Sequence, residues 1–249
     1  MPAASFAPPS APAYVAIPGG SFMSVLSGGS AANVAVPVAP FALRATPVTV
    51  AQFAAFIETH PEWQRAQVAP LFADSSYLQD FEAQAHAADT AQQAVTNVSW
   101  FAAQAYCESE GARLPTWYEW EYVAASDAKR LDARKDPAWR AAILAWYSRP
   151  AGVSRPAVGG APNVYGVRDM HGLIWEWVDD FNALLVSADS RNQGDPEKLQ
   201  YCGAGAISLQ DRDNFAILMR IALLSALGGR DTTSTLGFRC ARPSTLEQK

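Results

Sequence analysis

An acidic residue between two tryptophans, Glu176, has the setting in this chain that points most clearly to chemistry. The tryptophans flank it directly, within an otherwise apolar run. Burying a carboxylate beside indole rings is costly unless a cation or several hydrogen-bond donors meet it. We therefore expect Glu176 to be paired with a cation, to be hydrogen-bonded to backbone N–H groups, or to ligate a metal ion.

The residues just before Glu176 form the loop that must position it. Gly166 and Gly172 allow sharp backbone turns on either side of Asp169. A second carboxylate therefore lies within the same short segment. Residues 163–178 become the candidate site, and the rest of the chain is considered in relation to them.

Composition indicates a globular protein that does not bind nucleic acid. The 249 residues, 49% of them hydrophobic, are enough for one large domain with its own core. The formal net charge is −5 and the basic residues are scattered, so no basic patch matches a phosphate backbone. No apolar run approaches the roughly 20 residues that span a bilayer. We expect a soluble protein without a membrane span.

The two ends of the chain differ in composition from its middle. Residues 1–13 are rich in Pro and Ala and resemble the start of a mature exported chain to which Met1 was added, although no secretory signal is visible. We expect this stretch to be disordered or a linker. The domain itself is expected to cover residues 14–243, followed by a tail over 244–249.

The first third of the chain predicts short strands and then a helix. From Tyr14 to Ala42, glycine pairs separate short β-branched or alternating stretches. Thr49 and Gln52 have the spacing of a capping box, and apolar residues recur on one helical face after them. The pair His60-Pro61 should end this helix, and residues 62–96 are predicted to be loop.

The middle of the chain predicts three more helices. Ser99 is a plausible N-cap for a helix that runs to Glu110 and stops at a glycine. Thr116 and Glu119 form another capping box, for a helix to about residue 125. The dipeptide Asp136-Pro137 begins an amphipathic helix over 138–147.

The last part of the chain combines an apolar segment with a short strand. Residues 214–227 are unusually apolar and compatible with a helix, and a glycine pair follows them. Residues 236–241 predict a single final strand. The stretch 215–227 is either additional core or a docking surface, and core is the reading we favour.

Three cysteines leave two interpretations open. Cys107, Cys202 and Cys240 lack the short spacing of a zinc knuckle or a redox pair. They are either three inert buried thiols or one disulfide with an odd thiol left over.

Four blocks of sequence, in this order, resemble the formylglycine-generating-enzyme superfamily, also called sulfatase-modifying factors. The blocks are Pro47-Val48-Thr49, Val98-Ser99-Trp100 through Glu119-Trp120-Glu121-Tyr122, Asn163-Val164-Tyr165-Gly166 through Trp175-Glu176-Trp177, and Leu236-Gly237-Phe238-Arg239. The resemblance spans roughly residues 14–243. It implies an α+β, C-type-lectin-like fold with long loops and little regular secondary structure.

The resemblance also implies a structural calcium ion. Carried over by position, its ligands are Asp169, the main-chain carbonyls of Gly172 and Ile174, and the carboxylate of Glu176. Calcium takes six to eight hard oxygen ligands, and water would complete this set.

The resemblance further implies a disulfide between Cys107 and Cys240. The chain-entropy model gives such a long loop roughly 4–5 kcal/mol of stabilisation. A bridge of this kind indicates an oxidising compartment, so we expect a periplasmic or secreted protein, with a cytoplasmic one as the alternative. Cys202 would then remain free.

Neither redox metal of the superfamily is expected. Its oxidases bind copper(I) through two cysteines after a Gly-Gly-Ser, whereas here Gly203-Ala204-Gly205 stands at that place and residues 206–237 contain no cysteine. A related branch holds non-haem iron through a His-x-x-x-His-x-Glu motif. His60, His86 and His171, the histidines of this chain, do not have that spacing.

The sequence therefore favours a non-catalytic, accessory-type member of this superfamily, TagR-like, that binds a protein partner. The alternative is a metal-dependent oxidative tailoring enzyme of the same superfamily, either of the pyoverdine-maturation type or formylglycine-generating. The loss of the copper cysteines, with the fold-maintaining positions kept, favours the first hypothesis.

Overall fold

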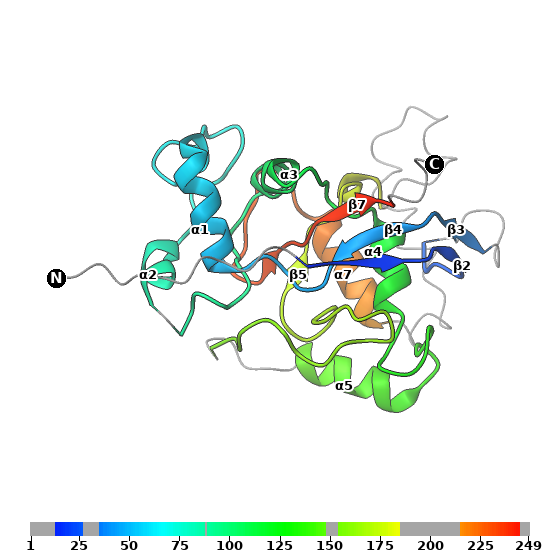
Figure 1. The fold of residues 1–249 in the computed structure, drawn as a ribbon. Helices are drawn as coiled ribbons and strands as arrows, with labels where there is room; N and C mark the ends of the chain where they lie inside the picture. Colours follow the sequence, from blue (N-terminus) through cyan, green and yellow to red (C-terminus); the bar gives the residue numbers. More distant parts are fainter. Residues whose placement is uncertain (1–12, 27–34, 88, 148–153, 185–214, 245–249) are drawn as a thin grey trace.

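The computed structural model describes residues 13–26, 35–87, 89–147, 154–184 and 215–244 (Figure 1). Nearly all of the expected N-terminal linker and C-terminal tail lie outside these ranges, as do Cys202 and Gly203-Ala204-Gly205. One continuous hydrophobic cluster extends from Ile17 to Ala241. The two ends of the expected domain therefore share a core.

Small sheets form the strand part of the fold. Strand β4 (Phe41–Arg44) lies between β1 (Tyr14–Ile17) and β7 (Ala241–Pro243), and both neighbours run antiparallel to it (Figure 1). Strands β2 (Gly20–Phe22) and β3 (Val36–Val38) form an antiparallel pair. The short strands that were predicted for residues 14–42 are thus confirmed.

The prediction of one final strand over residues 236–241 is wrong. The chain forms two strands there, β6 (Leu236–Gly237) and β7, which belong to different sheets. Strand β6 pairs in parallel with β5 (Trp175–Glu176), whereas β7 pairs with β4. The residues between β6 and β7 are fully buried and hydrogen-bond to the segment around the end of β4. The Phe238 carbonyl accepts the Val48 N–H, and the Cys240 carbonyl accepts the Arg44 N–H.

Three predicted helices have their predicted caps. Helix α1 (Val50–Thr59) and helix α4 (Trp117–Ala124) each begin with a complete capping box, from Thr49 and Thr116. Helix α3 (Trp100–Ser109) begins at Ser99, whose hydroxyl accepts the Ala102 N–H. A side-chain oxygen at the N-cap satisfies an N–H group that the helix cannot, so these starts are readable from sequence.

Two longer helices complete the expected set, and short ones were missed. Helix α5 (Pro137–Tyr147) and helix α7 (Phe215–Ser225) lie where they were predicted. Helix α2 (Phe81–His86) lies within the stretch predicted to be loop and the 3-10 turn η1 (Pro61–Trp63) at its start, while no element was predicted at the 3-10 turn η2 (Phe181–Ala183). The α+β class is confirmed. Within the described part of the chain, no helix has the length and apolar character needed to cross a bilayer.

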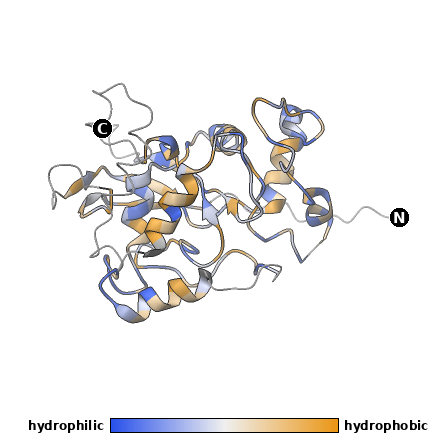
Figure 2. Ribbon diagram, turned by 180° about the vertical axis from the view of Figure 1, so that it is seen from behind, coloured by the Kyte–Doolittle hydropathy of each residue, from blue (hydrophilic) through white to orange (hydrophobic). Residues whose placement is uncertain are grey.

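Helix α7 belongs to the core. Its residues Ile217, Ile221 and Leu224 are buried in the main hydrophobic cluster. Seen from behind, its ribbon has apolar colouring along most of its length (Figure 2). Of the two readings of this segment, additional core is therefore the one that the packing supports.

Candidate functional site

The carboxylate of Glu176 is fully buried and is paired with a cation. Both Glu176 and Arg239 have no exposed surface. The Arg239 guanidinium donates to both carboxylate oxygens, Nε to Oε2 and Nη2 to Oε1, each over 2.8 Å. The Trp120 indole N–H also donates to Oε2, over 2.9 Å. Of the alternatives that the sequence left open, the described contacts are those of the ion pair.

Strand pairing positions this carboxylate. In the parallel β5–β6 ladder, Glu176 is opposite Gly237, two residues before Arg239. A Cβ atom at residue 237 would lie 2.1 Å from the Val95 carbonyl oxygen and 2.8 Å from the Ile174 side chain. Only glycine fits such a close approach, so the absence of a side chain at residue 237 lets β6 bring Arg239 to Glu176.

The remaining N–H groups of Arg239 bind main-chain oxygens. Its Nη2 donates to the carbonyls of Arg168 and Asp169, over 3.0 and 3.2 Å, and its Nη1 donates to Arg44 over 3.3 Å. A guanidinium has five donors, which suits it to joining several acceptors at once. Arg239 thus ties the 168–169 loop and the end of β4 to Glu176.

A second buried arginine, Arg220 of α7, meets the same segment from another side. Its guanidinium lies over the Trp120 ring, 3.6 Å from the centroid, and 5.8 Å from the Trp117 centroid. Its Nη2 also donates to the main-chain carbonyl of Glu176. Cation–π contacts strengthen when they are desolvated, and Arg220 is only 2% exposed. The α7 helix is therefore anchored on the candidate site.

Asp169, the second expected ligand, directs its carboxylate to a different partner. Its backbone has a φ of +58°, and Gly166 and Gly172 both have a φ of +91°, which confirms the turns predicted on either side of it. Its carboxylate accepts the N–H groups of Gly159 and Gly160, over 2.6 and 3.0 Å. Asp169 thus holds the preceding loop in place.

These contacts do not fit a calcium ion at the expected position. Glu176 already has a full counter-charge in Arg239, which also takes the carbonyl of Asp169. An ion held by both carboxylates and by the carbonyls of Gly172 and Ile174 would require Glu176 and Asp169 to leave their present donors. Calcium needs six to eight oxygens at once. Calcium at this segment stays a prediction from the resemblance.

A second buried acid, Glu121 of α4, lies in an equally specific environment. Its carboxylate accepts from the Ser24 hydroxyl, the Val25 N–H and the Trp117 indole, over 2.5, 2.9 and 2.8 Å. Arg134 lies 3.7 Å away. Burial raises the pKa of Glu121, against the lowering effect of these donors. The donors fix the residue as a structural anchor for the 24–25 segment.

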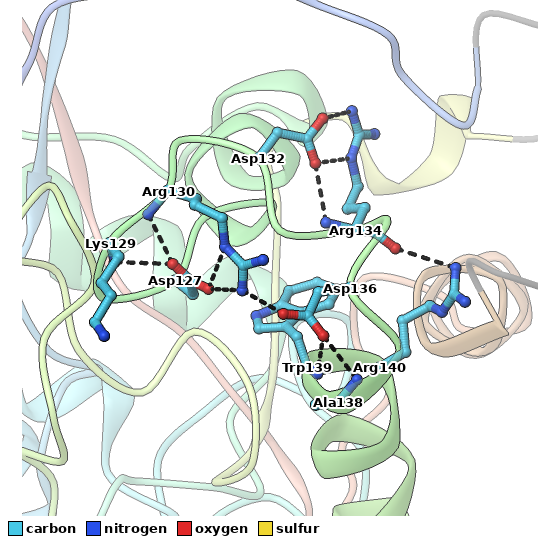
Figure 3. A network of polar contacts seen from close by, with 9 residues as sticks. All are labelled: Asp127, Lys129, Arg130, Asp132, Arg134, Asp136, Ala138, Trp139 and Arg140. Atoms are coloured by element: carbon cyan, nitrogen blue, oxygen red, sulfur yellow. Dashed lines mark hydrogen bonds and ion pairs between the residues drawn. The ribbon is translucent and has the colours of Figure 1, made fainter.

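Arg134 belongs to a network of ion pairs on the turn before α5 (Figure 3). Arg130 bridges Asp127 and Asp136, while Arg134 pairs with Asp132 over 2.7 Å. The Arg130 side chain is 48% exposed, so water screens its two pairs and they contribute little to stability. This surface network contrasts with the dry pair at Glu176.

His171 lies within the candidate segment but does not act as a ligand there. Its Nε2 is 2.9 Å from the carbonyl of Ala124, the last residue of α4. Burial lowers the pKa of His171 to about 4, and the charges of Arg220 and Arg239 add to this. The imidazole is therefore neutral at physiological pH, and its Nε2–H group can donate to the last carbonyl of α4.

Cys107 and Cys240 are joined by a disulfide, with Cα atoms 5.5 Å apart. The pairing that the resemblance implied is confirmed, and it links α3 to the segment between β6 and β7. Because the chain has three cysteines, only Cys202 retains a thiol. That residue lies outside the described ranges.

No other constellation suited to a metal emerges from the part of the chain that the structure describes. There, no group of three or more His, Cys, Asp or Glu side chains is placed to hold an ion. Of the other histidines, His60 stacks on Phe56 at the end of α1. The described site is a closed cluster of charges and indoles, suited to holding segments together.

The sequence located Glu176 but not its partners. Arg239, Trp120 and Arg220 were present in the quoted blocks or the apolar segment, yet no role was assigned to them. A signal was available for Arg239, since it directly precedes a cysteine expected to be buried. Nothing in the spacing indicated that Arg220, 44 residues after Glu176, would reach its carbonyl.

The chain matches a known family model over nearly its whole length. Residues 2–244 match the profile of the sulfatase-modifying factor enzyme 1-like domain. The formylglycine-generating enzyme of Streptomyces coelicolor is 32% identical over 173 residues, which cover 61% of this chain and 53% of that protein. The inactive C-alpha-formylglycine-generating enzyme 2 of Bos taurus is 28% identical over 160 residues, covering 59% and 49%. The matching part thus spans about half the length of these relatives.

Among solved structures, PvdO from Pseudomonas aeruginosa superimposes with a TM-score of 0.48 at 18% identity, covering 94% of this chain and 95% of that one. The sequence relatives include one protein named as a formylglycine-generating enzyme and one named as inactive. Family alone therefore does not decide between catalysis and another role.

Proposed function

Because the chain belongs to the sulfatase-modifying factor enzyme 1-like domain family, we propose that it is a non-catalytic member that acts by binding a protein partner. The observation that carries this proposal is the number of available thiols. Copper(I) in a two-cysteine site needs two soft thiolates. With Cys107 and Cys240 in a disulfide, the chain supplies one, Cys202.

The buried cluster supports the same proposal. Glu176 and Arg239 have no exposed surface and already satisfy each other, so neither is available to a substrate. Helix α7, which follows the stretch where the resemblance places the copper motif of relatives, is fixed to this cluster by Arg220. We assign this closed framework to recognition.

The proposal places the protein in the periplasm or outside the cell. Disulfides persist in oxidising compartments and are rare in the cytosol. The bridge between Cys107 and Cys240 is therefore the support for this location. A partner would be found in the same compartment.

Catalysis is tested on the purified full chain. Bound copper and iron are measured by mass spectrometry, and oxygen consumption is followed with a cysteinyl peptide. We expect neither metal to be retained after copper(I) loading and buffer exchange, and equal oxygen traces with protein, with the Cys202→Ser variant and without protein. Turnover that Cys202→Ser abolishes would contradict the proposal. A tightly bound redox metal would instead support the oxidative-tailoring alternative.

Partner binding is tested in an extract of the native cells. The chain has a mass of 26.7 kDa, and the purified protein alone provides the reference elution volume on a sizing column. We expect the protein in the extract to elute earlier than this reference. Coincident elution in extract and buffer would count against a stable partner.

A further inference from the structure

We propose that the cation at the centre of the Asp169–Glu176 segment is the guanidinium of Arg239, and that this segment therefore needs no calcium. The bidentate pair with Glu176 places Arg239 on one of the two expected ligand carboxylates, and its bond to the Asp169 main-chain carbonyl places it beside the residue that carries the other. The proposal is independent of whether the protein is catalytic.

Charge supports this assignment. Among the residues that the structure describes, Glu176 is the carboxylate that pairs with Arg239, and the pair is neutral and buried. A second guanidinium, that of Arg220, donates to the main-chain carbonyl of Glu176. A divalent cation bound to Glu176 would therefore lie close to two buried positive groups, where little water is present to screen the repulsion.

The second carboxylate does not offset this repulsion, because it serves the preceding loop. Asp169 accepts two backbone N–H groups, those of Gly159 and Gly160. The packing there is tight, since a Cβ atom at Gly160 would lie 2.6 Å from the Asp169 Oδ1 atom. Turning this carboxylate toward an ion would leave two N–H groups without their acceptor.

Arg239 also joins the loops that a calcium ion would join. Through four acceptor residues, Arg44, Arg168, Asp169 and Glu176, the Arg239 side chain joins chain segments distant in sequence. A multivalent metal joins loops in the same manner. Because Arg239 is covalently part of the chain, its contribution does not depend on ion concentration.

The test uses the unmodified full chain. After exhaustive treatment with EDTA, calcium chloride is titrated by calorimetry, and thermal unfolding is recorded in EDTA and in millimolar calcium. We expect no saturable heat and the same melting temperature in both solutions. Magnesium chloride at the same ionic strength controls for general salt effects.

Variants at Asp169 and Glu176 decide the meaning of any calcium response. A one-to-one calcium signal that raises the melting temperature, and that Asp169→Asn or Glu176→Gln removes, would overturn the proposal. A calcium signal unchanged in both Glu176→Gln and Asp169→Ala lies at another site and leaves Arg239 as the central cation. Because Asp169→Asn keeps a carbonyl acceptor for a glycine N–H group, this variant is expected to fold even where the other two do not.

Discussion

Replacing Glu176 by glutamine tests the buried pair most directly. The substitution keeps the shape of the side chain and removes only its charge, which leaves the Arg239 guanidinium buried without a counter-ion. Breaking one partner of a buried pair costs about 3–5 kcal/mol. Since Gln retains one carbonyl that can accept from Arg239 or Trp120, we expect the lower end, about 3 kcal/mol.

The assay is equilibrium unfolding in guanidinium chloride together with thermal unfolding. For a chain of this size, 1 kcal/mol corresponds to about 2–4 °C, so the melting temperature should fall by roughly 6–12 °C. Asp127→Asn is the matched control, because it also neutralises a carboxylate paired with arginine, but at the surface. We expect no measurable change in that variant. A loss below about 1 kcal/mol in Glu176→Gln would refute the reasoning.

A double variant separates the pair from its surroundings. Adding Arg239→Met to Glu176→Gln removes the isolated charge, although it also removes the Arg239 bonds to the main-chain carbonyls. We therefore expect the double variant to lose less stability than the sum of the losses in Glu176→Gln and in Arg239→Met alone. Two losses that simply add would show that the residues do not interact.

Three further substitutions or conditions test other parts of the fold. Gly237→Ala should prevent accumulation of folded protein, measured by soluble yield and circular dichroism, because its Cβ would lie 2.1 Å from the Val95 oxygen. The pKa of His171 is lowered to about 4 in the folded protein, so as the pH falls the unfolded chain binds a proton at this residue before the folded protein does. The stabilisation by neutral His171 is therefore complete above about pH 6.5 and is lost as the pH falls toward 4. His171→Gln should flatten the pH dependence of the free energy of unfolding in this range. Titration of thiols in denaturant without reductant should find one per chain. Reduction of the bridge between Cys107 and Cys240, which are 133 residues apart, should lower the free energy of unfolding by about 5 kcal/mol in chemical unfolding. Three thiols before reduction, or a reduced protein of equal stability, would contradict the disulfide or its stabilising role.

Local rules were sufficient for the longer helices. The side chains of Thr49, Ser99 and Thr116 satisfy N–H groups within their own first turn, so the information lies within four residues. Helix α7 was predictable from its own composition, since Arg220 and Ser225 are its polar residues and the others are apolar. Helix α2 has only six residues and depends on Phe81 packing against the α1 face, which no local pattern encodes.

Long-range pairing was beyond the sequence. The final strand is split because β6 pairs with β5 while β7 pairs with β4, and neither partner strand is close in sequence. The partner of Glu176 was missed for the same reason. The physical requirement that a buried carboxylate be compensated was clear, but the choice between Arg239 and a metal ion depends on where β6 places a side chain 63 residues away.

The same contacts show how much of the described fold depends on Glu176. Glu176 receives bonds from α4 through Trp120, from the chain after β6 through Arg239 and from α7 through Arg220. Substitution at Glu176 would therefore disturb three elements of the described chain at once.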